Sequence, residues 1–162
     1  MQGERFERLY TEHAEPLLRF LIFRTGNRGM AEDVVADTFE RVLRSGRRFD
    51  PRRASEKTWL YTIALNLLRD QGRRKAAEIR ALERVGSSGV DLDEGRGLRA
   101  AEASGDLARA LDNLPADQRE VVALRFGADL TLPEIGEVTK EPRTTVEGRL
   151  YRALRKLRGE LE

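Results

Sequence analysis

The chain has 162 residues, enough for one domain or two small ones, with 36% charged and only 6% aromatic residues. It contains no cysteine, which excludes disulfides and thiolate metal sites, and no apolar run approaches the ~20 residues of a membrane-spanning helix. The N-terminus lacks the apolar segment of a secretory signal, so we expect a cytoplasmic protein without membrane insertion.

Helical periodicity runs through residues 4–76, with breaks at residues 25–29 and 45–53. Apolar residues recur there at i, i+3, i+4 and i+7, which is typical of amphipathic helices. They form three stripes: Phe6, Leu9, Tyr10, Leu17, Phe20, Leu21 and Phe23; Val34, Val35, Phe39, Val42 and Leu43; and Trp59, Leu60, Ile63, Ala64, Leu67 and Leu68.

Residues 77–105 interrupt the periodicity and are rich in glycine and acidic residues. We expect a flexible linker that helix can flank on either side, with a random-coil span of about 30 Å.

Residues 106–162 are helical again. Val121, Val122, Leu124 and Phe126 lie on one helix, and Thr131 with Glu134 predicts a capping box for a short helix that ends near Thr139. Pro142 precedes a long helix, about residues 143–160, with a predicted buried face of Val146, Leu150, Ala153, Leu154 and Leu157. The fold class is therefore all-α, with small helical domains at 1–76 and 106–162 joined by the linker 77–105, the second domain being a helix-turn-helix.

The long C-terminal helix is basic on its other side, at Arg149, Arg152, Arg155 and Lys156. A short helix, a tight turn and a longer basic helix predict a DNA-binding helix-turn-helix. Arginine suits this role because its guanidinium group can donate two hydrogen bonds at once to a guanine edge or a phosphate. The alternative is an ordinary solvated basic face at a helix C-terminus.

Four segments, in this order and spacing, resemble the extracytoplasmic-function (ECF) group of bacterial sigma-70-type sigma factors. They are residues 31–42 (AEDVVADTFERV), 58–70 (TWLYTIALNLLRD), 114–121 (LPADQREV) and 149–154 (RLYRAL). The resemblance covers about residues 6–76 and 111–158. It implies an RNA polymerase sigma factor that initiates transcription at specific promoters. Region 2 (1–76) would bind core polymerase and open the −10 element, and region 4 (106–162) would read the −35 element.

The resemblance implies that helix 31–43 contacts the clamp of core polymerase. It also implies that the chain contacts the flap of core polymerase. Asp33, Asp37 and Glu40 share one face, which would attract a basic partner, although alone it reads as a solvated face. Ala36 stands where the family usually has Gln. The expected polymerase-binding residues are Asp33, Asp37, Thr38, Phe39, Glu40 and Arg41.

The stretch from Phe49 to Lys75 is the expected −10 reader. By the resemblance, the loop 49–56 captures a flipped base, and aromatic side chains in the next helix can stack on bases. Ser55 has the alternative of capping that helix, Trp59 more often lies in a core, and Asn66 has the alternative of a solvent-facing amide. The expected residues are Asp50, Arg52, Arg53, Ser55, Trp59, Tyr61, Asn66, Arg69, Arg73, Arg74 and Lys75.

For the −35 element the expected residues are Arg143, Thr144, Thr145, Glu147, Arg149, Tyr151, Arg152 and Lys156. Four positions depart from the family pattern: Lys140, Glu141, Thr144 and Glu147. Glu147 either completes a capping box with Thr144, which we favour, or accepts a hydrogen bond from a cytosine amine. The departures leave open whether −35 reading is weakened or redirected.

No P-loop, paired-carboxylate site or metal-ligand spacing occurs, so we expect no enzyme activity, cofactor or metal. His13, the only histidine, reads as a surface residue. The expected partners are core RNA polymerase, promoter DNA and, by the resemblance, an anti-sigma factor. The alternatives are a sigma-like adaptor or decoy that binds polymerase or a regulator without reading promoters, and a stand-alone helix-turn-helix repressor, which leaves residues 6–76 unexplained.

Overall fold

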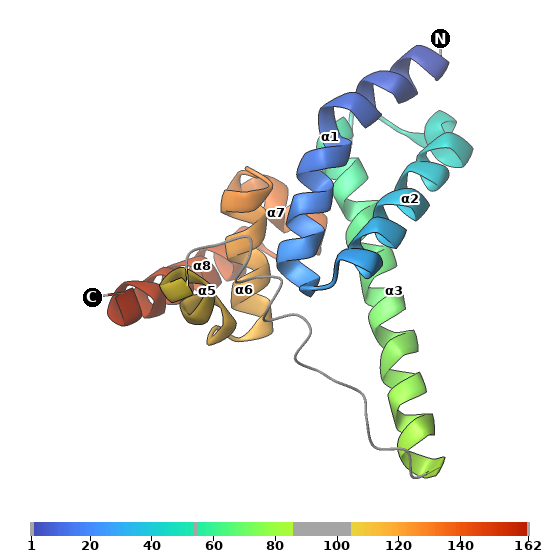
Figure 1. The fold of residues 1–162 in the computed structure, drawn as a ribbon. Coiled ribbons are helices and arrows are strands. Elements are labelled where there is room, and N and C mark those ends of the chain that lie inside the picture. The colour runs from blue at the N-terminus through green and yellow to red at the C-terminus, as the bar shows by residue number, and fades with distance from the viewer. Residues whose placement is uncertain (1, 54, 86–104, 162) are drawn as a thin grey trace.

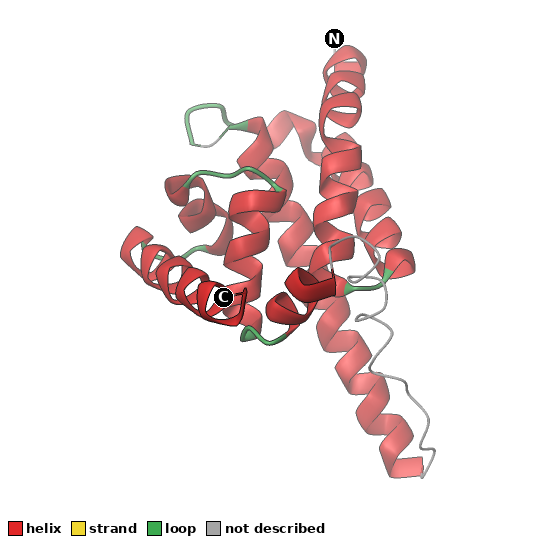
Figure 2. Cartoon of the chain, turned by 60° about the vertical axis from the view of Figure 1, so that its left-hand side comes forward, coloured by secondary structure: helices red, strands yellow, loops and turns green. Residues whose placement is uncertain are grey.

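The computed structural model describes residues 2–53, 55–85 and 105–161, and every regular element in these ranges is helical, as expected (Figure 1). The first part of the chain forms α1 (Gln2–Thr25), α2 (Arg28–Ser45), the 3-10 helix η1 (Gly46–Arg48) and α3 (Glu56–Val85). The second part forms α5 (Gly105–Asp112), α6 (Ala116–Val122), the π-helical turn η2 (Ala123–Gly127), α7 (Leu132–Thr139) and α8 (Arg143–Leu161). Figure 2 shows that short loops join these helices within each part.

Local chemistry sets the helix boundaries. Gly26 has φ 67°, a left-handed conformation that ends α1, and the Asn27 side chain then accepts a hydrogen bond from the Met30 backbone to start α2. Thr131 and Glu134 form both hydrogen bonds of the capping box at α7, which confirms that prediction. The turn between α1 and α2 and the start of α7 are thus specified by the residues next to them.

Helix α3 is longer than the sequence pattern suggested. It continues to Val85, so residues 77–85 of the expected linker are helical, and residues 86–104 lie outside the described residues. The C-terminal half of α3 projects beyond the helical bundle in Figure 1. The basic end of α3 is consequently presented on a free-standing helix.

One apolar core joins the two parts of the chain. Phe20, Leu60 and Leu65 from α1 and α3 belong to the same buried cluster as Leu130 and Ile135 from the second part. A second cluster packs α5 and α6 against α8 through residues such as Leu111, Val122 and Leu157. Each part therefore has apolar packing of its own, and α1 and α3 also pack against η2 and α7.

Four apolar side chains of the helical pattern are exposed. Leu154 is 42% exposed, so its expected burial is wrong, and Phe126, on the helix pattern before α7, is 60% exposed. Tyr10 and Leu43 are also exposed, on α1 and α2. All four lie at the edge of a stripe, where a shift of one residue turns a side chain by about 100° around the helix.

Candidate nucleic-acid interface

The turn between α7 and α8 brings two backbone segments into close contact. Lys140 adopts φ 60° at the end of α7, the left-handed conformation that glycine adopts most easily. The Glu141 backbone N–H then donates to the Gly136 carbonyl over 3.0 Å. A Cβ on Gly136 would lie 2.9 Å from the Glu141 carbonyl oxygen, so only glycine fits there without displacing the turn.

The first turn of α8 differs from the predicted capping box. The helix begins at Arg143, and the Pro142 carbonyl accepts hydrogen bonds from the Thr145 and Val146 backbones. Thr144 therefore lies inside the helix, and the preferred capping role of Glu147 is wrong. Glu147 instead accepts a hydrogen bond from Arg143 Nε over 3.1 Å, one helical turn earlier.

The expected DNA-reading side chains of α8 fall into two groups. Tyr151, Arg152 and Lys156 are exposed, as are Arg143, Thr144 and Glu147, while Thr145 is half-buried. Arg149 differs, since its side chain is only 22% exposed and contacts two carboxylates. It donates to Glu141 Oε1 over 2.7 Å and lies 3.3 Å from Asp117 Oδ2. The hydrogen bond to Glu141 raises the pKa of Arg149, so this guanidinium stays charged.

The loop before α3 is ordered by its own polar side chains. Asp50 accepts a hydrogen bond from the Arg52 backbone over 2.9 Å and lies 3.8 Å from Arg53 Nε. Ser55 Oγ accepts from the Thr58 backbone over 3.1 Å, so Ser55 caps α3. Asp50, Arg52, Arg53 and Ser55 are exposed, so these loop side chains lie on the surface.

Trp59 and Tyr61, which were both expected to stack on bases, have different surroundings in the structure. Trp59 is half-buried, with its ring centroid 5.0 Å from that of Phe49, which in turn lies under the Arg5 guanidinium. Tyr61 is completely buried and packs edge-on against Phe20 at 5.7 Å. In this arrangement Tyr61 cannot stack on a base, so the DNA contact expected of it is wrong.

Burial and an unsatisfied hydroxyl characterise Tyr61 further. Its Oη has no hydrogen-bond partner among the described residues, and burial raises the pKa of Tyr61 to about 12. The clue was its spacing: Tyr61 precedes Ala64 and Leu65 by three and four positions, which puts it on the buried face of α3.

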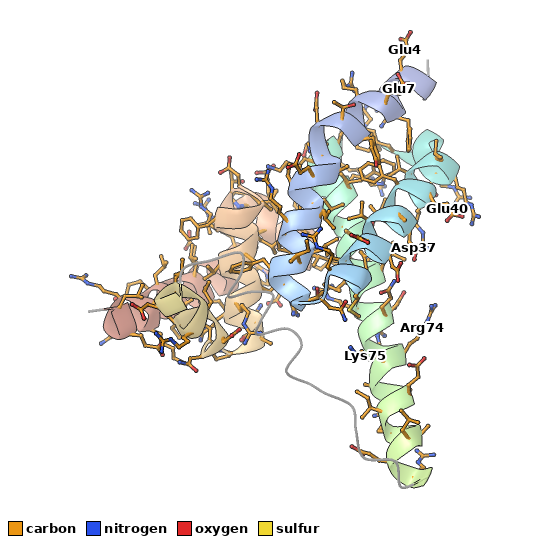
Figure 3. The ribbon with its side chains drawn as sticks, in the orientation of Figure 1. Glu4, Glu7, Asp37, Glu40, Arg74 and Lys75 are labelled. Atoms are coloured by element: carbon orange, nitrogen blue, oxygen red, sulfur yellow. The ribbon has the colours of Figure 1, made fainter. Side chains whose placement is uncertain are left out.

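The basic end of α3 is open to solvent. Arg73, Arg74 and Lys75 are exposed, and Figure 3 shows Arg74 and Lys75 on the part of α3 that leaves the bundle. Arg73 also lies 3.3 Å from Asp70. Asn66 and Arg69, closer to the bundle, are half-buried.

Helix α2 carries the acidic face expected to bind a protein. Asp33, Asp37, Glu40 and Arg41 are exposed, and Figure 3 shows Asp37 and Glu40 on the outer side of the bundle. Thr38 and Phe39 are buried, and the Thr38 hydroxyl donates to the Val34 carbonyl over 2.6 Å. Thr38 therefore supports the helix from its inner side, and the direct polymerase contact expected of it is wrong. Phe39 also lines a groove between α1 and α2, so its contact with polymerase stays a prediction.

A groove between α1 and α2 borders this acidic face, and sequence reasoning missed it. Its walls include Tyr10, Leu18, Val35 and Leu43, and its acidic residues are Glu15, Glu32 and Glu40. The exposed Tyr10 and Leu43 are the apolar residues that the periodicity had assigned to the core. An apolar groove with carboxylates at its edges suits a helix with an apolar face and basic flanks.

Two family models match the chain in the expected order. The models described as Sigma-70 region 2 and Sigma-70, region 4 match residues 9–78 and 110–159. The RNA polymerase sigma factor SigV of Bacillus subtilis is 31% identical over 157 residues, which cover 93% of this chain and 87% of that relative. The chain belongs to the ECF group of sigma-70 family sigma factors.

Other sigma factors share most of this chain. The ECF RNA polymerase sigma factor RpoE of Cereibacter sphaeroides is 30% identical, with 91% of this chain and 81% of the relative covered. The ECF RNA polymerase sigma factor BldN of Streptomyces coelicolor is 28% identical over 96% of this chain, which spans only 60% of that relative.

Two solved structures have the same fold. The sigma factor RpoE in complex with the anti-sigma factor NepR from Bartonella quintana matches with a TM-score of 0.77 at 23% identity, covering 98% of this chain and 97% of that one. CnrH, in complex with the cytosolic domain of CnrY, matches with a TM-score of 0.70 at 28% identity, covering 98% of this chain and 88% of that one.

Regions 2 and 4 of this sigma factor are joined by ion pairs as well as by their shared core. Glu120 in α6 lies 3.3 Å from Arg24 Nε in α1 and 3.9 Å from Arg69 Nη2 in α3. Lys57 Nζ donates to the Asp129 carbonyl over 3.3 Å. Arg69, expected to meet DNA, is thus engaged by region 4 in this structure.

The remaining titratable groups do not form a site. His13 is half-buried, with 17% of its side chain exposed, so it reaches the surface only in part, and burial lowers its pKa despite Glu12 at 3.7 Å. Among the described residues no cluster of histidine and carboxylate side chains is suited to a metal. Within the same ranges, no helix has the length and apolar character needed to cross a membrane.

Proposed function

We propose that this sigma factor directs core RNA polymerase to specific promoters in the cytoplasm and takes no enzymatic part in RNA synthesis. Family membership, with region 2 and region 4 in order, is the observation that carries the proposal. Helix α2 binds the polymerase clamp through Asp33, Asp37 and Glu40, and region 4 contacts the flap.

Promoter reading is divided between α3 and α8. The loop 49–56 and the exposed basic end of α3 hold the opened −10 strand, because arginine and lysine follow a single-stranded backbone. Arg152 and Lys156 on α8 face the −35 duplex. The two elements lie at least one helical turn apart, about 34–36 Å, so regions 2 and 4 separate from their shared core when both are bound.

Run-off transcription tests this proposal. The purified full chain is mixed with core polymerase of its own bacterium and with DNA fragments from its genomic neighbourhood. We expect discrete transcripts that core polymerase alone does not make. Their absence from every fragment, with a holoenzyme that assembles, would contradict the proposal and favour the adaptor.

The adaptor or decoy has one observation in its favour. Glu141 and Glu147 bind Arg149 and Arg143, which reduces the positive charge that α8 offers to phosphates near its start. Such a protein would bind polymerase without initiating.

An anti-sigma factor is the further partner we propose. The similar RpoE of Bartonella quintana was solved with the anti-sigma factor NepR. Co-purification with a small protein encoded beside this chain, and loss of transcription when that protein is added, would identify it.

A further inference from the structure

Arg149 occupies a different position from the other cations of α8. Its side chain is 22% exposed, whereas Arg152, Arg155 and Lys156 are exposed on the outer faces of the helix. Its guanidinium contacts Glu141 in the turn before α8 and Asp117 in α6. A single side chain therefore ties three segments of region 4 together.

The turn fixes where the Glu141 carboxylate lies. The left-handed Lys140 and the close approach of the Glu141 backbone to Gly136 leave that backbone little freedom. Glu141 Oε1 accepts from Arg149 Nη1, and Arg149 Nε faces Asp117. An arginine held at two separate nitrogens is oriented more firmly than one held at a single point.

The charge of this group argues against a phosphate contact by Arg149. One guanidinium shared by Glu141 and Asp117 leaves a formal surplus of negative charge. A DNA phosphate brought to the same nitrogens would meet both carboxylates. The two departures from the family pattern, at Glu141 and Lys140, take part in the same arrangement.

We infer that Arg149 is a positioning residue, which together with Glu141 and Asp117 sets the direction of α8 and so places Arg152 and Lys156 against the −35 duplex. This inference rests on the proposed function of α8 as a reader of duplex DNA. It replaces the direct DNA contact that the sequence suggested for Arg149. It also makes Glu141 a residue that supports DNA binding by orienting α8.

The experiment compares Arg149→Gln, Glu141→Gln and their double variant with Arg152→Gln as the matched direct-contact control. The full-length chain first selects its preferred duplex from a random-sequence library. Binding of that duplex is then measured at several salt concentrations, and each variant is checked by circular dichroism for retained helix. A chain that enriches no sequence refutes the proposed duplex reading itself, and the role of Arg149 with it.

We expect Arg149→Gln and Glu141→Gln each to weaken binding about tenfold, and the double variant to be no worse than either. The salt slope should stay unchanged in all three, whereas Arg152→Gln should lower it by about 0.9. Loss of α8 direction should also relax discrimination at several base pairs together, which a merely structural loss of folded protein would not do.

Two results would overturn the inference. One is a lower salt slope for Arg149→Gln with tighter binding by Glu141→Gln, which would make Arg149 a phosphate contact restrained by an acid. The other is unchanged affinity for both single variants, which would show that the ion pairs do not position α8. Should Arg149→Gln unfold, Glu141→Gln, which leaves the Asp117 contact in place, decides between these outcomes through its direction of change.

Discussion

At the scale of single residues, Tyr61 lies in the core although it was expected to meet DNA. The helix containing it was predictable, and so was its buried face, because Ala64 and Leu65 follow Tyr61 by three and four positions; the −10 interpretation had instead assigned Tyr61, like Trp59, to base stacking. The structure buries Tyr61 completely and leaves its hydroxyl without a partner among the described residues.

Tyr61→Phe should leave the protein as stable at neutral pH or more stable by about 1 kcal/mol, because the buried hydroxyl loses water without gaining a hydrogen bond. The pKa of Tyr61 is raised in the folded state to about 12 from 10.0, so its neutral form favours folding. That contribution is complete below pH 10 and is lost as the pH rises towards 12.

Urea unfolding of both proteins from pH 7 to 11 measures this effect. The wild type should lose more stability above pH 10 than Tyr61→Phe. Equal losses in the two proteins would show that Tyr61 ionises as an exposed phenol does.

At the scale of elements, the helix-turn-helix was largely predictable. Thr131, Pro133 and Glu134 specify the start of α7 by local chemistry alone, and the structure has that capping box. The predicted start of α8 near residue 143 is also confirmed, but the capping box of Thr144 and Glu147 is not, because the Pro142 carbonyl begins the helix two residues before Thr144. The Thr144–Glu147 spacing and the Pro142 start are both compatible with the sequence, and in the structure the hydrogen bonds to the Pro142 carbonyl begin the helix.

Gly136→Ala and Gly148→Ala form a matched pair of helix substitutions. Alanine gains about 1 kcal/mol of helix propensity at both sites. At Gly136 the new Cβ meets the Glu141 backbone at 2.9 Å, whereas at Gly148 the nearest atom, at 3.2 Å, belongs to the flexible Arg152 side chain. We expect Gly136→Ala to be destabilising by about 1–3 kcal/mol and Gly148→Ala to be neutral or stabilising in thermal unfolding. Equal effects at both sites would contradict the close turn.

The acidic face of α2 makes a prediction about polymerase. Asp33→Lys with Asp37→Lys should weaken core binding at least tenfold, because a basic partner would then meet like charge. Glu78→Lys, an equally exposed reversal on α3, is the control. Titration of labelled chain with core polymerase measures both. Wild-type affinity in the α2 variant would remove this face from the interface.

At the scale of the whole molecule, the contact between regions 2 and 4 escaped sequence analysis. Leu130 and Ile135 look like ordinary core residues of region 4, and nothing in their spacing indicates that they meet α1 and α3. Arg24 and Glu120 are 96 positions apart, with an ion pair that only the folded chain reveals. Helix content and the order of the two regions were predictable because they depend on local pattern and family resemblance, whereas the DNA-reading roles of α3 and α8 stay a proposal.

Glu120→Gln should loosen this contact, since a neutral amide attracts Arg24 and Arg69 far less. The Glu120 side chain is 15% exposed, so its two pairs are partly shielded from solvent, and we expect a loss of about 1 kcal/mol, roughly a fivefold shift towards separated regions. The chain has no cysteine, which allows two engineered labels for energy transfer. Glu137→Gln, exposed on α7, is the control. Identical distance distributions in both variants and the wild type would rule out Glu120 as a contributor.

We propose that one chain opens DNA with region 2 while region 4 holds the duplex upstream. Footprinting of the holoenzyme on a promoter found by run-off transcription tests it most directly, with permanganate for unpaired thymines and nuclease for protected duplex. We predict unpaired thymines in the −10 element and protection of the −35 duplex in the same complex. Protection without unpaired thymines, or no protection beyond that given by core polymerase alone, would contradict this division between regions 2 and 4.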